Sequence, residues 1–151
     1  MSFFKRLFAS NAPKRLDHPV FGEAVFIEAK LGSYREAEVD IGEDCLFVAI
    51  DAPDQQEPTQ SQVEFYERIM AMPDQTFSLV QSVLVPAFEN WSKTHFPKDW
   101  REVLKLSGLS VPVDGNNNLL WELSFEAKVL NKQLFTCRFE SGKPVQVEIS
   151  G

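Results

Sequence analysis

The sequence predicts an α+β domain: a mostly antiparallel sheet formed by an N-terminal and a C-terminal meander, with a central group of about three helices packed on one face. Three observations support this. Strand-like segments both precede and follow a helical region. Residues 34–41 alternate apolar and acidic, which is typical of a half-buried strand. Residues 74–95 repeat apolar side chains at steps of three and four, which indicates a long amphipathic helix.

The first meander is predicted from three consecutive segments. Residues 24–31 are rich in strand-forming side chains and end at a Gly-Ser turn. In residues 34–41 the apolar side chains point one way and the carboxylates the other, because successive residues of a strand face opposite sides of the sheet. Residues 45–50 are continuously apolar, as expected for a central strand covered on both faces.

The helical region begins after a polar loop at residues 51–58. Thr59 and Gln62 have the spacing of a capping box, so a helix is expected to start there and to stop before Pro73. The long helix follows, and Pro86 inside it predicts a kink, because the apolar stripe continues beyond the proline. A third, short helix is predicted at residues 98–106.

The second meander is predicted from four alternating segments. A short strand at residues 109–113 is followed by a Gly- and Asn-rich turn, and then by strands at 119–127, 134–140 and 145–149. Residues 141–144 link the last two as a hairpin. The exposed side of these strands again carries carboxylates.

The chain is predicted to comprise a basic amphipathic segment, residues 1–15, and a single α+β domain, residues 16–151. In the segment, Lys5 and Arg6 lie opposite a phenylalanine-rich side. Such a terminus commonly docks on its own domain or stays loose until a partner arrives. The alternative is a weak peripheral contact of residues 1–9 with an anionic membrane surface.

The net charge of −7 is unevenly distributed. Residues 17–91 carry fifteen acids and three bases, whereas residues 92–151 carry seven acids and eight bases. An acidic field of this kind repels phosphates, so we expect no nucleic-acid binding; it favours a basic protein as partner. The absence of an apolar run of about 20 residues and of a signal peptide makes a cytoplasmic location the expectation.

No motif for catalysis or cofactor binding is present. Cys45 and Cys137 lie in predicted strands and are expected to be free, buried thiols, and the two histidines, His18 and His95, form no ligand pair with them. The spacing of the acids at positions 40, 43, 44, 51, 54 and 57 does not match a calcium-binding EF-hand loop, and the glycines do not form a phosphate loop. The sequence therefore predicts no catalytic residue, metal or cofactor, and it favours a protein that is not an enzyme.

Three short stretches resemble a group of uncharacterised bacterial domains that often lie near toxin and immunity genes. They are residues 18–22, the glutamine-led helix 60–72, and the close of the chain, residues 134–151. The resemblance covers most of residues 16–151 and leaves out the basic first fifteen. The resemblance implies a role in binding another protein. The group has no established catalytic residues that could be assigned to positions of this sequence.

The leading hypothesis is a non-enzymatic, immunity-type domain whose acidic surface occludes a basic partner. The residues expected to bind that partner are Glu36, Glu38, Asp40, Asp51, Asp54 and Glu57. The alternative is a small-molecule-binding domain or enzyme with a pocket between sheet and helices around His95, Trp100 and Trp121. A further alternative is an accessory domain docked by its N-terminal helix. The sequence does not predict the oligomeric state.

Overall fold

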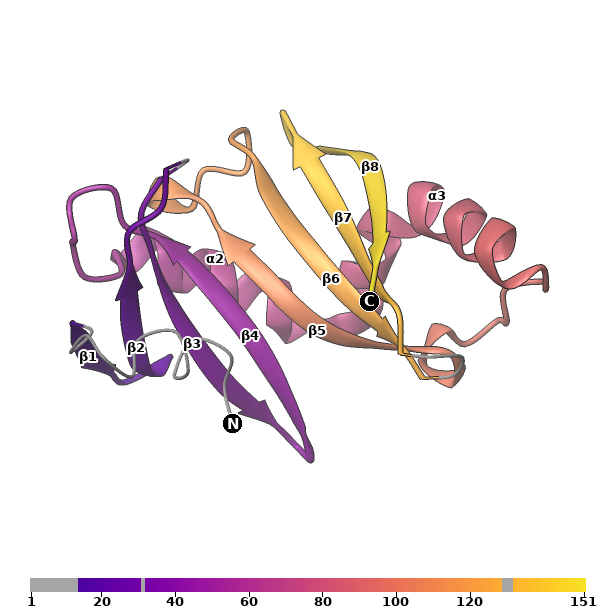
Figure 1. Cartoon of the computed structure of the whole chain (residues 1–151), viewed down its shortest axis with the longest axis horizontal. Helices are drawn as coiled ribbons and strands as arrows, with labels where there is room; N and C mark the ends of the chain where they lie inside the picture. The colour runs from indigo at the N-terminus through magenta and orange to yellow at the C-terminus, as the bar shows by residue number, and fades with distance from the viewer. Residues whose placement is uncertain (1–13, 31, 129–131) are drawn as a thin grey trace.

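The computed structural model describes residues 14–30, 32–128 and 132–151. In this part of the chain eight strands form one sheet in the order of the sequence, and two α-helices, α2 and α3, lie behind the sheet in Figure 1. Every pair of neighbouring strands is antiparallel except β4 and β5, which are parallel. The predicted α+β class and the two meanders are thereby confirmed.

The first meander comprises β1 (Arg15–His18), β2 (Gly22–Ile27), β3 (Tyr34–Ile41) and β4 (Asp44–Asp51). The sequence did not predict β1, which is only four residues long. The turn after it is closed by the imidazole of His18, whose Nδ1 accepts from the backbone N–H of Val20 at 3.1 Å. This bond holds the chain so that β1 can pair with β2.

The two helices, α2 (Gln60–Ala71) and α3 (Pro73–Ser92), connect the meanders. The predicted capping box is confirmed: Thr59 Oγ1 accepts from the N–H of Gln62, and Gln62 Oε1 accepts from the N–H of Thr59. Helix α3 continues through Pro86, as its apolar stripe predicted. Because the two helices carry the chain back to the end of the sheet at which β4 begins, β5 runs parallel to β4.

The second meander comprises β5 (Leu104–Val111), β6 (Trp121–Ala127), β7 (Leu134–Glu140) and β8 (Lys143–Ser150). Along β6 and β7, alternate residues are buried, which matches the predicted pattern. Figure 1 shows this meander in orange and yellow beside the violet first meander.

The predicted third helix, residues 98–106, is wrong. Its first part is a single 3₁₀ turn, Trp100–Glu102, in which Asp99 accepts from the N–H of Arg101, and β5 begins at Leu104. A β-bulge between Leu106 and Gly108 explains the error. The bulge inserts an extra residue, so the alternation of this strand breaks and its apolar residues resemble one side of a helix.

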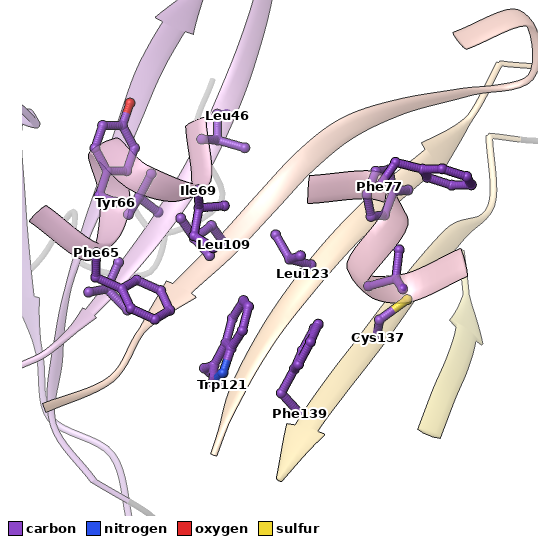
Figure 2. Close-up of a cluster of buried hydrophobic side chains, with 14 of the residues drawn as sticks. Leu46, Phe65, Tyr66, Ile69, Phe77, Leu109, Trp121, Leu123, Cys137 and Phe139 are labelled. Carbon is purple, nitrogen blue, oxygen red and sulfur yellow. The ribbon is translucent and has the colours of Figure 1, made fainter. Parts of the chain in front are cut away.

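The core lies between the helices and one face of the sheet, and aromatic side chains dominate it. Trp121 stacks on Phe139 with ring centroids 3.9 Å apart, and Phe65 meets the Trp121 ring edge-on. These three rings lie side by side in Figure 2. Trp100 is buried, and its ring stacks on Phe77. The helix-facing side of the sheet is therefore largely filled.

The predicted basic segment, residues 1–15, lies almost entirely outside the described residues, so its proposed docking or membrane contact and the boundary at residue 16 stay predictions. Of the helices that the structure describes, neither has the combination of length and apolar character needed to cross a membrane.

Candidate functional site

The second face of the sheet points away from α2 and α3, and we call it the open face (Figure 1). Its residues follow from the alternation and the strand register, because they are offset by one from the buried residues on each strand. The open face includes Tyr34, Glu36, Glu38, Asp40, Cys45, Phe47, Ala49, Asp51, Lys105, Gly108, Ser110, Glu122, Ser124, Glu126, Thr136, Arg138, Gln146 and Glu148.

Charge is distributed unequally over the open face. On the second meander, acidic side chains have basic neighbours: Lys105 Nζ lies 3.7 Å from Glu126 Oε1, and Arg138 is the cross-strand neighbour of Glu122. On β3 the three consecutive outward side chains are all acidic; we call Glu36, Glu38 and Asp40 the acidic row. Within residues 14–30, 32–128 and 132–151, no cationic side chain forms an ion pair with any member of this row.

Glu36, the first residue of the acidic row, is electrostatically strained. Burial and, to a smaller extent, the neighbouring charge of Glu38 together raise the pKa of Glu36 from 4.5 to about 7. Burial also raises the pKa of Asp51, which lies on the same face at the end of β4. Near neutral pH, Glu36 is therefore held in a place that disfavours its charge, and a cation brought to this face would relieve the strain.

We expect Glu36→Gln to stabilise the protein near and above neutral pH but not in acid. Because folding raises the pKa of Glu36, the unfolded state releases this proton more readily, and ionisation costs stability as pH rises from about 4.5 to about 7. The side chain is half exposed, so solvent screening reduces the expected gain to roughly 1 kcal/mol. Thermal unfolding near pH 4 and near pH 8 should show a higher melting temperature than wild type only at the higher pH.

The exposed Glu64→Gln on α2 provides the control and should shift the melting temperature equally little at both pH values. A Glu36→Gln protein with the same advantage at both pH values would show that Glu36 is not strained in the folded state.

A line of residues crosses the open face. It contains the exposed ring of Phe47 and, beside it, three small residues on β5, β6 and β7. Consecutive register pairs place six residues in line across six strands. We call this line the central row: Glu38, Phe47, Gly108, Ser124, Thr136 and Glu148. Phe47 is 45% exposed, and its neighbour on β5, Gly108, has no side chain to cover the ring.

The close packing beyond Phe47 explains the glycine. A Cβ at position 108 would lie 3.2 Å from Ser124 Cβ, tighter than ordinary contacts, and Ser124 is itself hydrogen-bonded to Thr136 through their hydroxyls at 3.0 Å. Between Phe47 and Glu148, the open face therefore carries no large side chain in this line, only Gly108 and the hydroxyl-bearing Ser124 and Thr136.

The structure brings four of the six predicted partner-binding residues to one face. The acidic row and Asp51 share the open face, whereas Asp54 and Glu57 are exposed in the loop after β4. The buried Arg35 fastens that loop by donating to the backbone carbonyls of Gln55 and Gln56, at 2.7 and 2.9 Å. Sequence reasoning missed Phe47, because a continuously apolar strand was expected to be buried on both faces.

The predicted pocket residues do not come together. His95 is fully exposed, with its Nδ1 3.5 Å from a Glu89 carboxylate oxygen. Trp100 lines a cavity of about 240 Å³ that opens between β5 and the α2–α3 junction, with Arg101, Lys105 and Lys128 among its other lining residues. Trp121 lines a different cavity.

The cavity at Trp121 has a volume of about 250 Å³ and lies between the helices and the end of the β7–β8 hairpin. Its lining combines aromatic rings with Arg68, whose guanidinium carbon is 5.3 Å from the centre of the Phe65 ring. The indole Nε1 of Trp121 is buried and has no hydrogen-bond partner in the described part of the chain.

The two cysteines have different environments. Cys137 is buried in the core, and burial raises its pKa to about 12. Cys45, expected to be buried, is exposed on the open face, and its pKa is raised by partial burial and then by Glu38 and Asp40. Both are free, and their strands, β4 and β7, are separated by two others. Neither thiol has the lowered pKa of a nucleophile.

Neither a search for metal ligands among the described residues nor comparison with known proteins identifies a further site. In the residues that the structure describes, no group of three or more His, Cys, Asp and Glu side chains is arranged to hold a metal ion. A scan against protein-family models, a search of curated proteins and a search of solved structures each gave no match. The resemblance to bacterial domains near toxin and immunity genes stays a prediction from short motifs.

Proposed function

We propose that this protein is a non-enzymatic binding domain whose open face docks a basic partner protein. The observation that carries the proposal is the acidic row, three neighbouring carboxylates without an ion-pair partner in the described structure, beside the exposed ring of Phe47. Complementary charge accelerates association, and a central aromatic side chain supplies contact area that can be fully desolvated. The pairing of the two features on one face of the sheet favours docking over catalysis.

The strain at Glu36 adds a thermodynamic reason. A carboxylate with a raised pKa gains more from a nearby cation than a fully solvated one does, because it has already lost part of its hydration. Docking a basic protein would then lower the pKa of Glu36 and release the strain. As an immunity-type domain, the protein would act by occlusion, covering a functional surface of its partner.

The test is affinity capture from the source cells with three baits. They are the wild type, the variant Glu36→Gln/Glu38→Gln/Asp40→Asn, and a control that removes the same charge from exposed sites away from the open face, Glu64→Gln/Glu67→Gln/Glu102→Gln. Captured proteins are identified by mass spectrometry after washing at low and at high salt, because exposed charge contacts are screened by salt.

If the open face docks a basic partner, wild type and control should retain one basic protein at low salt and lose it at high salt. The acidic-row variant should not retain that protein at either salt. Equal retention by all three baits would contradict a role for the open face. Equal loss from both triple variants would show that only net charge matters.

A second candidate function is binding of a small planar ligand in the cavity at Trp121. The unpartnered Nε1 of Trp121 and the guanidinium of Arg68 at its lining favour this alternative. Titration with benzoate, followed by tryptophan fluorescence, would support it if binding saturates in the wild type and is lost in Arg68→Gln. An unsaturable or variant-independent signal would exclude benzoate-like ligands from this cavity.

A further inference from the structure

Phe47 is placed so that one side chain of a partner can contact its ring and a carboxylate together. Glu38 is its direct neighbour on β3, and side chains in this position have Cβ atoms roughly 5 Å apart. Its neighbour on β5 is Gly108, so the ring stays accessible from that side. The exposed ring thus has a negative charge on one flank and open space on the other.

Arginine is the side chain that satisfies both features. A guanidinium is planar, so it can stack on an aromatic face while its edge donates hydrogen bonds to a carboxylate. The ammonium group of lysine is a compact, strongly hydrated charge that pairs with the carboxylate but gains less from the ring. The low floor beyond Phe47, formed by Gly108 and Ser124, leaves room for the aliphatic part of an arginine.

The same arrangement occurs within the chain. The guanidinium of Arg101 lies 4.7 Å from the centre of the Trp100 ring, and its Nη1 lies 2.6 Å from Asp74 Oδ1. Arg101 therefore stacks on an aromatic ring and pairs with a carboxylate at once. On the open face, Phe47 and Glu38 provide the ring and the carboxylate, and the arginine is missing from the described structure.

We propose that the open face binds an arginine side chain of the basic partner, which stacks on Phe47 and pairs with Glu38. This inference rests on the proposed function, since it names the anchor of the docked partner. Glu36 and Asp40, two residues away on either side, supply the field that attracts further basic residues. The acidic row then sets how fast a basic protein associates, and the Phe47 anchor selects arginine over lysine.

The test compares two probes, acetylated hexaarginine amide and hexalysine amide, by calorimetric titration of the full chain at low ionic strength. The variant is Phe47→Leu, which removes the ring but keeps an apolar side chain at an exposed position; its melting temperature verifies that it folds. Wild type should bind hexaarginine about fivefold more tightly than hexalysine, the ratio that a cation–π contact of about 1 kcal/mol near the surface gives. In Phe47→Leu that preference should fall to within about twofold, with hexalysine affinity unchanged.

The outcomes separate the two proposals. Binding of both peptides with no preference for arginine, or a preference that persists in Phe47→Leu, would overturn the arginine anchor and leave the acidic docking face in place. Binding of neither peptide would overturn both. In Glu38→Gln, the affinity for hexaarginine should fall to the affinity that wild type has for hexalysine, whereas Glu64→Gln should behave as wild type. This result would support the pairing with Glu38.

Discussion

Gln62→Ala is expected to destabilise the protein by about 3 kcal/mol, because it leaves buried backbone groups without partners. Gln62 is completely buried. Its Nε2 donates to the carbonyl oxygens of Asp51 at 2.8 Å and Pro112 at 3.2 Å, and its Oε1 accepts from the N–H of Thr59 at 3.0 Å. One side chain thus joins the end of β4, the turn after β5 and the start of α2. Denaturant unfolding of the variant would measure the loss.

Two further variants identify the cause. Gln60→Ala removes an exposed amide from the same helical turn, whose only side-chain partner in the described structure is Glu64, and should cost less than about 0.5 kcal/mol. Gln62→Glu keeps the acceptor for Thr59 but loses both donors, so it should remain strongly destabilised. If Gln62→Glu were as stable as wild type, the bonds to Asp51 and Pro112 would not contribute as described.

Gly115→Ala is expected to cost about 3 kcal/mol or more, because two penalties combine. Gly115 has a φ of +63°, a left-handed conformation that alanine rarely adopts, and an added Cβ would overlap the backbone carbonyl of Ser61 and lie 3.1 Å from Phe65 Cβ. The short 3₁₀ turn Val113–Gly115 packs against α2 at this point. The carbonyl carbon and oxygen of Ser61 belong to the backbone of α2, so they cannot move without shifting the helix.

Gly22→Ala is the matched control. Gly22 has a similar φ of +70°, but nothing lies within 4 Å of an added Cβ. It should therefore show only the conformational penalty, about 1 kcal/mol. Equal destabilisation of the two variants by denaturant unfolding would mean that the contact of the turn with α2 does not matter.

Both predictions concern the junction that fixes the parallel pair at the centre of the open face. Gln62 bonds to the last residue of β4 and to the residue that follows β5, and Gly115 allows the turn after β5 to approach α2. The same two strands place Phe47 opposite Gly108. The buried junction thereby positions the exposed aromatic ring from the other side of the sheet.

The sequence predicted those parts of the fold that local patterns determine. The alternation of β3, β6 and β7, the capping box at Thr59 and the continuation of α3 through Pro86 each depend on residues close in sequence, and each is present. The bulge in β5 was not predictable, because it depends on pairing with β6 and interrupts the alternation from which a strand is recognised. The neighbour order of the strands likewise depends on long-range contacts.

The candidate site was predicted in part for the same reason. Strand alternation alone places the acidic row on one face, but whether a loop carboxylate joins it depends on how the loop is fastened. Arg35, buried and bonded to that loop, gave no signal in the sequence. The exposure of Phe47 could not be read from the apolar run of residues 45–50, because such a run is compatible with a strand covered on one face or on both.

The most direct test of the docking face is to map a bound cation onto the protein. Backbone amide spectra of the ¹⁵N-labelled chain, recorded during titration with hexalysine amide at low salt, report which residues sense the peptide. Docking on the open face predicts saturable shifts in β3, β4 and the facing residues of β5, with α2 and α3 unaffected and the shifts reversed by added salt. Shifts confined to the helices, or spread evenly over exposed carboxylates on both sides of the sheet, would contradict it.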